Sequence, residues 1–217
     1  MKVKRRIYQF NMITFIIFPM ILWLVYYLLT QSTPYSISRT YYSEIRYVFI
    51  IGMTIILVNH FIMIIVEKTN YYRLVLSILL TICYSLILMF PTAYSGSNET
   101  HVGLFMVPIE ISHIVHRISV LLYFGLYIVD MIYLLYKKRL GYMGILIPFY
   151  IISMFLLISG IAFDFNDLFN GYTYLMEMVL LDILAIYFYF LSKLTSHTSS
   201  DIMRDRKYVR LSNERRD

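Results

Sequence analysis

The segment Ile7–Thr30 reads IYQFNMITFIIFPMILWLVYYLLT and contains no charged residue. A helix that crosses the hydrocarbon core of a bilayer needs about 20 apolar residues. Basic residues precede the segment, as they do in a secretory signal, but this run is too long for a signal core and no small-x-small cleavage site follows it. The segment therefore predicts a first transmembrane helix.

The composition of the whole chain also indicates a membrane protein. Of its 217 residues, 59% are hydrophobic and 15% are charged, and the mean hydropathy is +0.67. Soluble domains are usually about 45–50% apolar and about 25% charged. We therefore do not expect a cytosolic enzyme, a disordered tail or a compact nucleic-acid-binding domain.

Further apolar runs, separated by polar breaks, follow the first one along the chain. Runs of this length are typical of transmembrane helices. The sequence predicts an all-α polytopic membrane bundle with six transmembrane helices in residues 1–193, followed by a basic tail over residues 194–217. The predicted helices cover residues 7–30, 47–66, 74–90, 108–136, 142–163 and 172–191.

The basic residues orient the predicted bundle. The net charge is +6, and most of the 19 basic residues fall before the first helix, in the second and fourth connections, and in the tail. These positions share one side of the membrane, and an excess of Lys and Arg marks the cytoplasmic side. The pattern predicts a multi-pass protein of the cell membrane with both termini cytoplasmic. Its predicted partners are membrane lipids, which the basic tail meets at anionic headgroups, and not nucleic acid.

Cofactors are not expected. The chain has one cysteine, Cys83, which excludes a disulfide within the chain and a thiolate zinc cluster. The histidines of the fourth helix and His60 lie at different predicted depths, so a haem is not expected either.

Ionisable residues are concentrated in the fourth predicted helix. Such a side chain at the centre of a membrane costs roughly 2.5–3.5 kcal/mol even on a lenient scale, so each one needs a reason. At 100° per residue, Glu110, His113 and Arg117 lie within about 60° of one another, and His116 lies about 60° further round. The sixth predicted helix carries two acidic residues at similar depths, Glu177 and Asp182.

Two interpretations of these residues remain open. In the structural one, Arg117 pairs with Glu177 or Asp182, and the histidines form hydrogen bonds between helices. In the functional one they form a site. A metal held by His113, His116 and Glu177 is a minor alternative. Glu110, His113 and His116 follow an i, i+3, i+6 spacing, which drifts too far round the helix for all three to share one ion, and no HExxH motif is present.

The connection Ser36–Arg46 is rich in hydroxyl groups and ends on Arg46. One interpretation is interfacial anchoring by its tyrosines. The other is a polar cover in which Arg46 binds a phosphate or carboxylate headgroup through two hydrogen bonds.

Four stretches of the chain, in order, resemble a group of bacterial six-helix membrane proteins related to domain-of-unknown-function (DUF) family 998. The chain departs from that pattern at Tyr47, where the family has an acidic residue, and at Glu67–Arg73, which lacks glycine. The family has no assigned activity, so the resemblance implies the fold and directs attention to Arg46, His116 and Glu177. The stretches that carry the resemblance are Ser36-Ile37-Ser38 with Tyr41-Tyr42, Arg46 and Val48-Phe49; Phe90-Pro91-Thr92; His116 to Phe124; and Glu177 with the apolar helix to Lys193.

The sequence thus predicts a polar pocket that opens on the outer side of the membrane. The favoured function is non-enzymatic: the pocket binds a lipid or amphiphile, or a partner membrane protein. One alternative is a membrane-embedded hydrolase acting on lipid headgroups, with His116 as general base or metal ligand and Glu177 as its partner. The second alternative is a small transporter using Glu177, Asp182 and Asp130. The predicted ligand-binding residues are Arg46, Glu110, His113, His116, Arg117, Glu177 and Asp182.

Overall fold

The computed structural model describes residues 2–37, 40–41, 43–91, 101–102, 107–137, 141–163 and 171–213. In this part of the chain there are six helices, each long and apolar enough to cross a membrane. The predicted class, an all-α bundle of six membrane helices, is confirmed. The helices are α1 (Lys2–Thr30), α2 (Arg46–Glu67), α3 (Tyr71–Met89), α4 (Ile109–Tyr136), α5 (Met143–Ala162) and α6 (Tyr172–Asn213).

Several helices extend beyond the apolar runs that predict them. α1 begins at Lys2 instead of residue 7, α3 begins at Tyr71 instead of residue 74, and α6 continues to Asn213. Backbone hydrogen bonding does not stop where hydrophobicity stops, so polar flanks continue these helices. A two-stranded antiparallel ladder, absent from the prediction, pairs β1 (His101–Val102) with β2 (Val107–Pro108) before α4.

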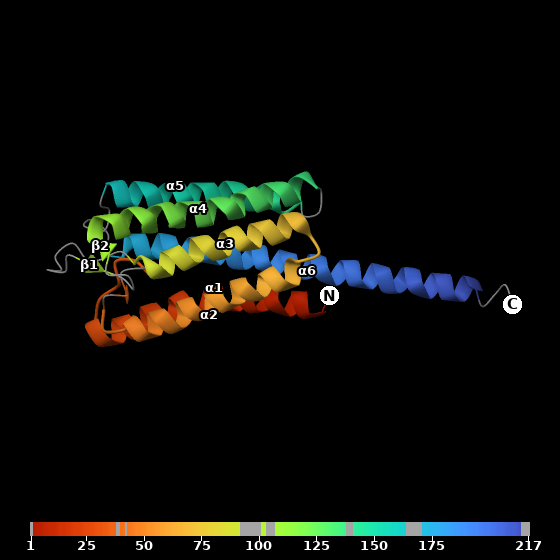
Figure 1. Cartoon of the computed structure of the whole chain (residues 1–217), viewed down its shortest axis with the longest axis horizontal. Coiled ribbons are helices and arrows are strands. Elements are labelled where there is room, and N and C mark those ends of the chain that lie inside the picture. The colour runs from red at the N-terminus through yellow and green to blue at the C-terminus, as the bar shows by residue number, and fades with distance from the viewer. Residues whose placement is uncertain are drawn as a thin grey trace.

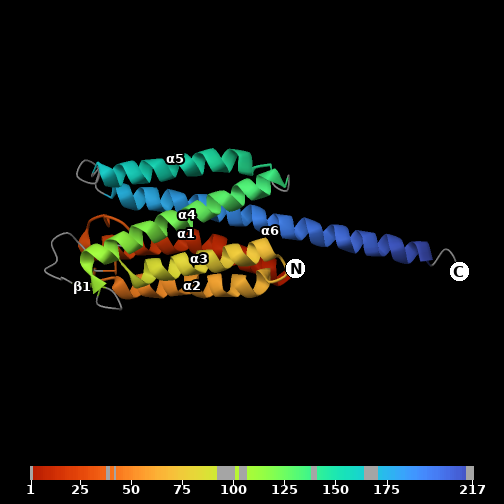
Figure 2. The ribbon, with the colours of Figure 1, turned by 45° about the horizontal axis from the view of Figure 1, so that its top comes forward.

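The helices run side by side and follow one another round the bundle (Figures 1 and 2). Each packs against its neighbour in the chain, and α1 packs against α6 to complete the ring. α5 therefore lies between α4 and α6. α6 extends past the other helices at the end where the chain starts (Figure 1). We call this the terminal end, and the opposite end, which holds the α1–α2, α3–α4 and α5–α6 connections, the loop end.

Aromatic side chains fill the interior of the ring. Gly52 of α2 allows the close approach of α1, because a Cβ at this position would lie 1.9 Å from the Phe18 ring. α6 is held to α1 by a hydrogen bond from the Tyr174 hydroxyl to the Pro19 carbonyl oxygen. The largest fully buried aromatic residues are Tyr8, Phe15, Phe49, Tyr127, Tyr150, Tyr187 and Phe188.

Candidate functional site: a cavity at the loop end

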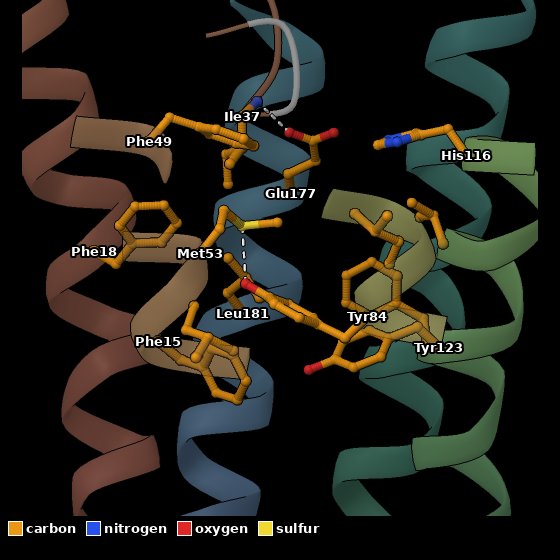
Figure 3. A pocket seen from close by; sticks show the side chains of 14 residues that line it. Phe15, Phe18, Ile37, Phe49, Met53, Tyr84, His116, Tyr123, Glu177 and Leu181 are labelled. Atoms are coloured by element: carbon orange, nitrogen blue, oxygen red, sulfur yellow. Dashed lines mark hydrogen bonds between the residues drawn. The ribbon is translucent and has the colours of Figure 1, made fainter. Parts of the chain in front are cut away.

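A cavity of about 80 Å³ lies inside the ring, toward the loop end (Figure 3). Its walls come from α1, α2, α3, α4 and α6, and most of them are apolar or aromatic. Ile37, from the connection between α1 and α2, closes one side. The lining residues are Phe15, Phe18, Ile37, Phe49, Met53, Ile56, Tyr84, Ile87, His116, Val120, Tyr123, Phe124, Glu177 and Leu181.

His116 and Glu177 supply the imidazole and the carboxylate of this lining, and they point toward one another across the cavity (Figure 3). His116 Nδ1 lies 2.8 Å from the carbonyl oxygen of Phe90, just after the end of α3. Because a carbonyl only accepts hydrogen bonds, Nδ1 carries a proton there. In the neutral ring, Nε2 is then left as an acceptor.

Glu177 is fixed by the chain between α1 and α2. Its Oε2 accepts a hydrogen bond of 2.5 Å from the backbone N–H of Ile37. Beside it, the Tyr174 backbone N–H donates to the Tyr35 carbonyl oxygen at 3.1 Å. These bonds hold the connection against α6 and bring Ile37, which is buried, over the cavity.

The other predicted site residues do not line the cavity. Arg46 is exposed, and its guanidinium lies on Tyr47, 5.1 Å from the ring centroid. Glu110, Arg117 and Asp182 are also exposed, and His113 is half-buried. Of the seven predicted ligand-binding residues, two, His116 and Glu177, therefore line the cavity.

Helix geometry explains why His116 is buried while its neighbours are not. Consecutive residues are 100° apart on a helix, so when His116 faces the interior, Arg117 lies about a quarter turn away, where its side chain is exposed. Glu110 and Arg117 belong to the same arc and share the outward orientation. Glu110, His113 and Arg117 thus lie on one side of α4 as predicted, while His116, at the edge of this group, faces the interior.

The predicted pairing of Arg117 with Glu177 or Asp182 is also not found. Among the side chains that the structure describes, which end at Thr195, there are two ion pairs, Lys4–Glu67 and Arg73–Asp130, each at 2.5 Å. Arg117 belongs to neither, because it lies on the outer surface of α4.

The Arg73–Asp130 pair lies in the terminal half of the bundle and is almost fully buried, with side-chain exposures of 9% and 0%. The Tyr187 hydroxyl donates to the same carboxylate, and Arg73 donates to that hydroxyl at 3.1 Å. Sequence reasoning missed this cluster because it assigned Arg73 to the connection after the second helix. In the structure Arg73 lies in the first turn of α3 and points into the ring.

Further polar side chains are buried between the helices. The Tyr123 hydroxyl is 3.1 Å from His60 Nε2, and Asn59 donates to Asn11 at 2.5 Å. At the terminal end, Lys4 and Arg73 line a second cavity of about 390 Å³. The sequence did not single out these tyrosines, because it contains 22 of them.

No cluster of three or more His, Cys, Asp or Glu side chains that could hold a metal ion occurs within the described ranges. The alternative metal set of His113, His116 and Glu177 is therefore not assembled. The cavity instead offers one carboxylate, one imidazole and aromatic faces, which suit hydrogen bonding and cation binding.

The fold defines a multi-pass membrane helix bundle with an interior cavity. No protein-family model, curated protein or solved structure matches this chain. The resemblance to DUF family 998 therefore stays a prediction, and three of its residues, Ser38, Tyr42 and Thr92, lie outside the described ranges.

Proposed function

We propose that this protein is a non-enzymatic membrane protein that binds the amine-bearing end of an amphiphile in the loop-end cavity. The observation that carries the proposal is a carboxylate set among aromatic walls: Glu177 shares the cavity with Phe15, Phe18, Phe49, Tyr84, Tyr123 and Phe124.

The chemistry of the cavity favours a cation. A carboxylate accepts hydrogen bonds from an ammonium group, and aromatic faces within about 6 Å attract cations, by about 2 kcal/mol or more where the site is desolvated. His116 is held by the Phe90 carbonyl oxygen and presents Nε2 as a second acceptor. The Glu177 carboxylate and His116 Nε2 therefore both favour a ligand that donates hydrogen bonds.

The size of the cavity restricts the ligand to one end of a molecule. At about 80 Å³ it has about half the volume of an engineered cavity of ~150 Å³ that holds benzene. A short amine-bearing segment fits this space, while the rest of the amphiphile lies outside it.

We place the protein in a bacterial cell membrane, with the terminal end in the cytoplasm. The basic residues of the terminal end, among them Lys4, Arg5, Arg6 and Lys68, support this orientation under the positive-inside rule. The cavity then lies in the outer half of the bilayer, and its ligand comes from the outer leaflet or from outside the cell.

Titration of octylammonium into protein in nanodiscs tests the proposal. We expect saturable binding to the wild type and at least a tenfold loss of affinity in Glu177→Gln. The matched control is Glu110→Gln, which removes an exposed carboxylate outside the cavity and leaves binding unchanged. Equal binding of octanoate would refute the preference for a cation. Release of headgroups from bilayer lipids would support the hydrolase alternative.

The buried polar side chains favour a second candidate function, a small transporter. Tyr123 lines the cavity, bonds to His60 and lies 3.4 Å from the Tyr127 hydroxyl. One helical turn beyond Tyr127, toward the terminal end, Asp130 pairs with Arg73, and Arg73 lines the second cavity. Proteoliposomes with an internal pH dye test this function. If it holds, Tyr123→Phe slows the decay of a pH gradient, whereas a decay equal to that of empty vesicles excludes it.

A further inference from the structure

Asp182 is an exposed carboxylate near the middle of a membrane span. The span runs from Tyr172 to Thr195, and Asp182 lies close to its centre. Its side chain is exposed, and it belongs to neither ion pair of the described ranges. Charged residues within membrane spans almost always face a bundle interior or a partner. An aspartate is also too short to reach the headgroups, as Lys and Arg do.

Arg117 is exposed within α4 in the same way. It shares a face with Phe124 and Leu135, which lie 7 and 18 residues further along the helix and so at nearly the same angle. Phe124 packs against Tyr150 of α5 at 6.2 Å between ring centroids, and Leu135 approaches Gly144 of α5. Arg117 therefore lies on the side of α4 that faces α5.

Asp182 lies on the other side of α5. The contacts of α6 with α5 run through Tyr172, beside Gly160, and Phe190, which stacks on Tyr142 at 4.9 Å. At 100° per residue, Asp182 is about 80° away from both contact positions, toward the outside of the bundle. The opposite charges of Arg117 and Asp182 thus flank α5, one on each neighbouring helix.

We propose that two copies of this chain associate side by side along α5, with Arg117 of each copy paired with Asp182 of the other. A two-fold axis perpendicular to the membrane, placed beside α5, brings α4 of one copy opposite α6 of its partner. The same operation generates the second pair, so both exposed charges of each copy are matched.

The depths of the two residues in the membrane permit this pairing. Such an axis keeps every residue at its own depth. His116 and Glu177 face one another across the cavity (Figure 3). Arg117 lies one residue beyond His116 on α4, and Asp182 lies five residues beyond Glu177 on α6, both toward the terminal end. At 1.5 Å per residue the two backbones differ by roughly 6 Å, which the long arginine side chain spans.

The outward face of α5 fits the centre of such an interface. Phe149, Ile152 and Phe155 are exposed there, with exposed fractions of 61%, 55% and 68%. Lipid covers an apolar face of this kind equally well. The two charges, and not the apolar area, therefore argue for a second copy.

Charge reversal in differently tagged copies tests the proposal in liposomes. Wild-type copies are expected to capture one another. Arg117→Glu places two acids in each pair and Asp182→Arg places two bases, so each variant expressed alone loses capture at least tenfold. When the two variants are co-expressed, their charges become complementary in both pairs, and capture returns to the wild-type level.

The complementary mixture also controls for folding, because a misfolded variant would not recover when mixed with the other. Self-association of either variant at the wild-type level would overturn the proposal. So would a wild type that remains monomeric, or one that captures a different membrane protein through Asp182 in place of its own copy.

Discussion

Removing the Asp130 charge should destabilise the bundle strongly, because Arg73 would remain charged in the interior. The Arg73 side chain is 9% exposed, and its partner is not exposed at all. Breaking a buried ion pair on one side typically costs about 3–5 kcal/mol, since the remaining charge stays desolvated. Asp130→Asn keeps the size of the side chain and removes the charge, so we expect it to lose about that much free energy of unfolding.

The assay is equilibrium unfolding in mixed detergent micelles, followed by the loss of helical circular dichroism. Arg5→Gln is the control, because Arg5 is an exposed cation at the terminal end of the bundle and should change stability by less than about 0.5 kcal/mol. Replacing both partners, Arg73→Met with Asp130→Leu, should recover most of the loss, since no unpaired charge remains. A loss below about 1 kcal/mol for Asp130→Asn, or a double variant no more stable than the single one, would show that Asp130 does not compensate a buried Arg73 charge.

Two further substitutions probe the packing of the interior, both measured by the same unfolding assay. Gly52→Ala places a Cβ against the Phe18 ring and should cost about 1–3 kcal/mol. The control is Gly125→Ala, because a Cβ added at Gly125 meets no atom within 4 Å, so this change should not destabilise the bundle. Equal effects of the two would contradict the close approach of α1 and α2. Tyr123→Phe removes the hydroxyl that is hydrogen-bonded to His60 Nε2 and should lower the free energy of unfolding by about 1–3 kcal/mol. An unchanged unfolding midpoint would show that this bond contributes nothing to stability.

The membrane fold was predictable because it depends on long-range averages of hydrophobicity. Each span needs about 20 apolar residues, and six such runs fill the chain. The ends of the helices were less predictable, since backbone hydrogen bonds continue through polar residues such as Lys2 and Tyr71. Nothing in the hydropathy of the final segment indicates that α6 continues to Asn213.

The candidate site was predictable only in part, because the direction of a helix face depends on its neighbours. The arc containing Glu110, His113 and Arg117 is a property of α4 alone. That His116, at the edge of this arc, faces the interior follows from the packing of α4 against α3, where His116 binds the Phe90 carbonyl oxygen.

Arg73 shows the same limit for the ion pairs. It follows Lys68 by five residues, and in the sequence it has the features of a cytoplasmic loop charge. Only the start of α3 at Tyr71 places it inside the ring opposite Asp130. Asp130 alone, a single acid deep in an apolar helix, was a signal that a buried cation should be sought.

Filling the loop-end cavity tests directly whether the cavity binds an amphiphile. Val120 lines the cavity and is half-buried, so Val120→Phe introduces a ring into the space without adding a charge. Native mass spectrometry of protein extracted from membranes would then count the retained amphiphile. We expect an amine-bearing amphiphile on the wild type and its loss from Val120→Phe, with circular dichroism unchanged. Equal retention by both proteins, or a wild type that retains no amine-bearing amphiphile, would show that the loop-end cavity does not bind such a ligand.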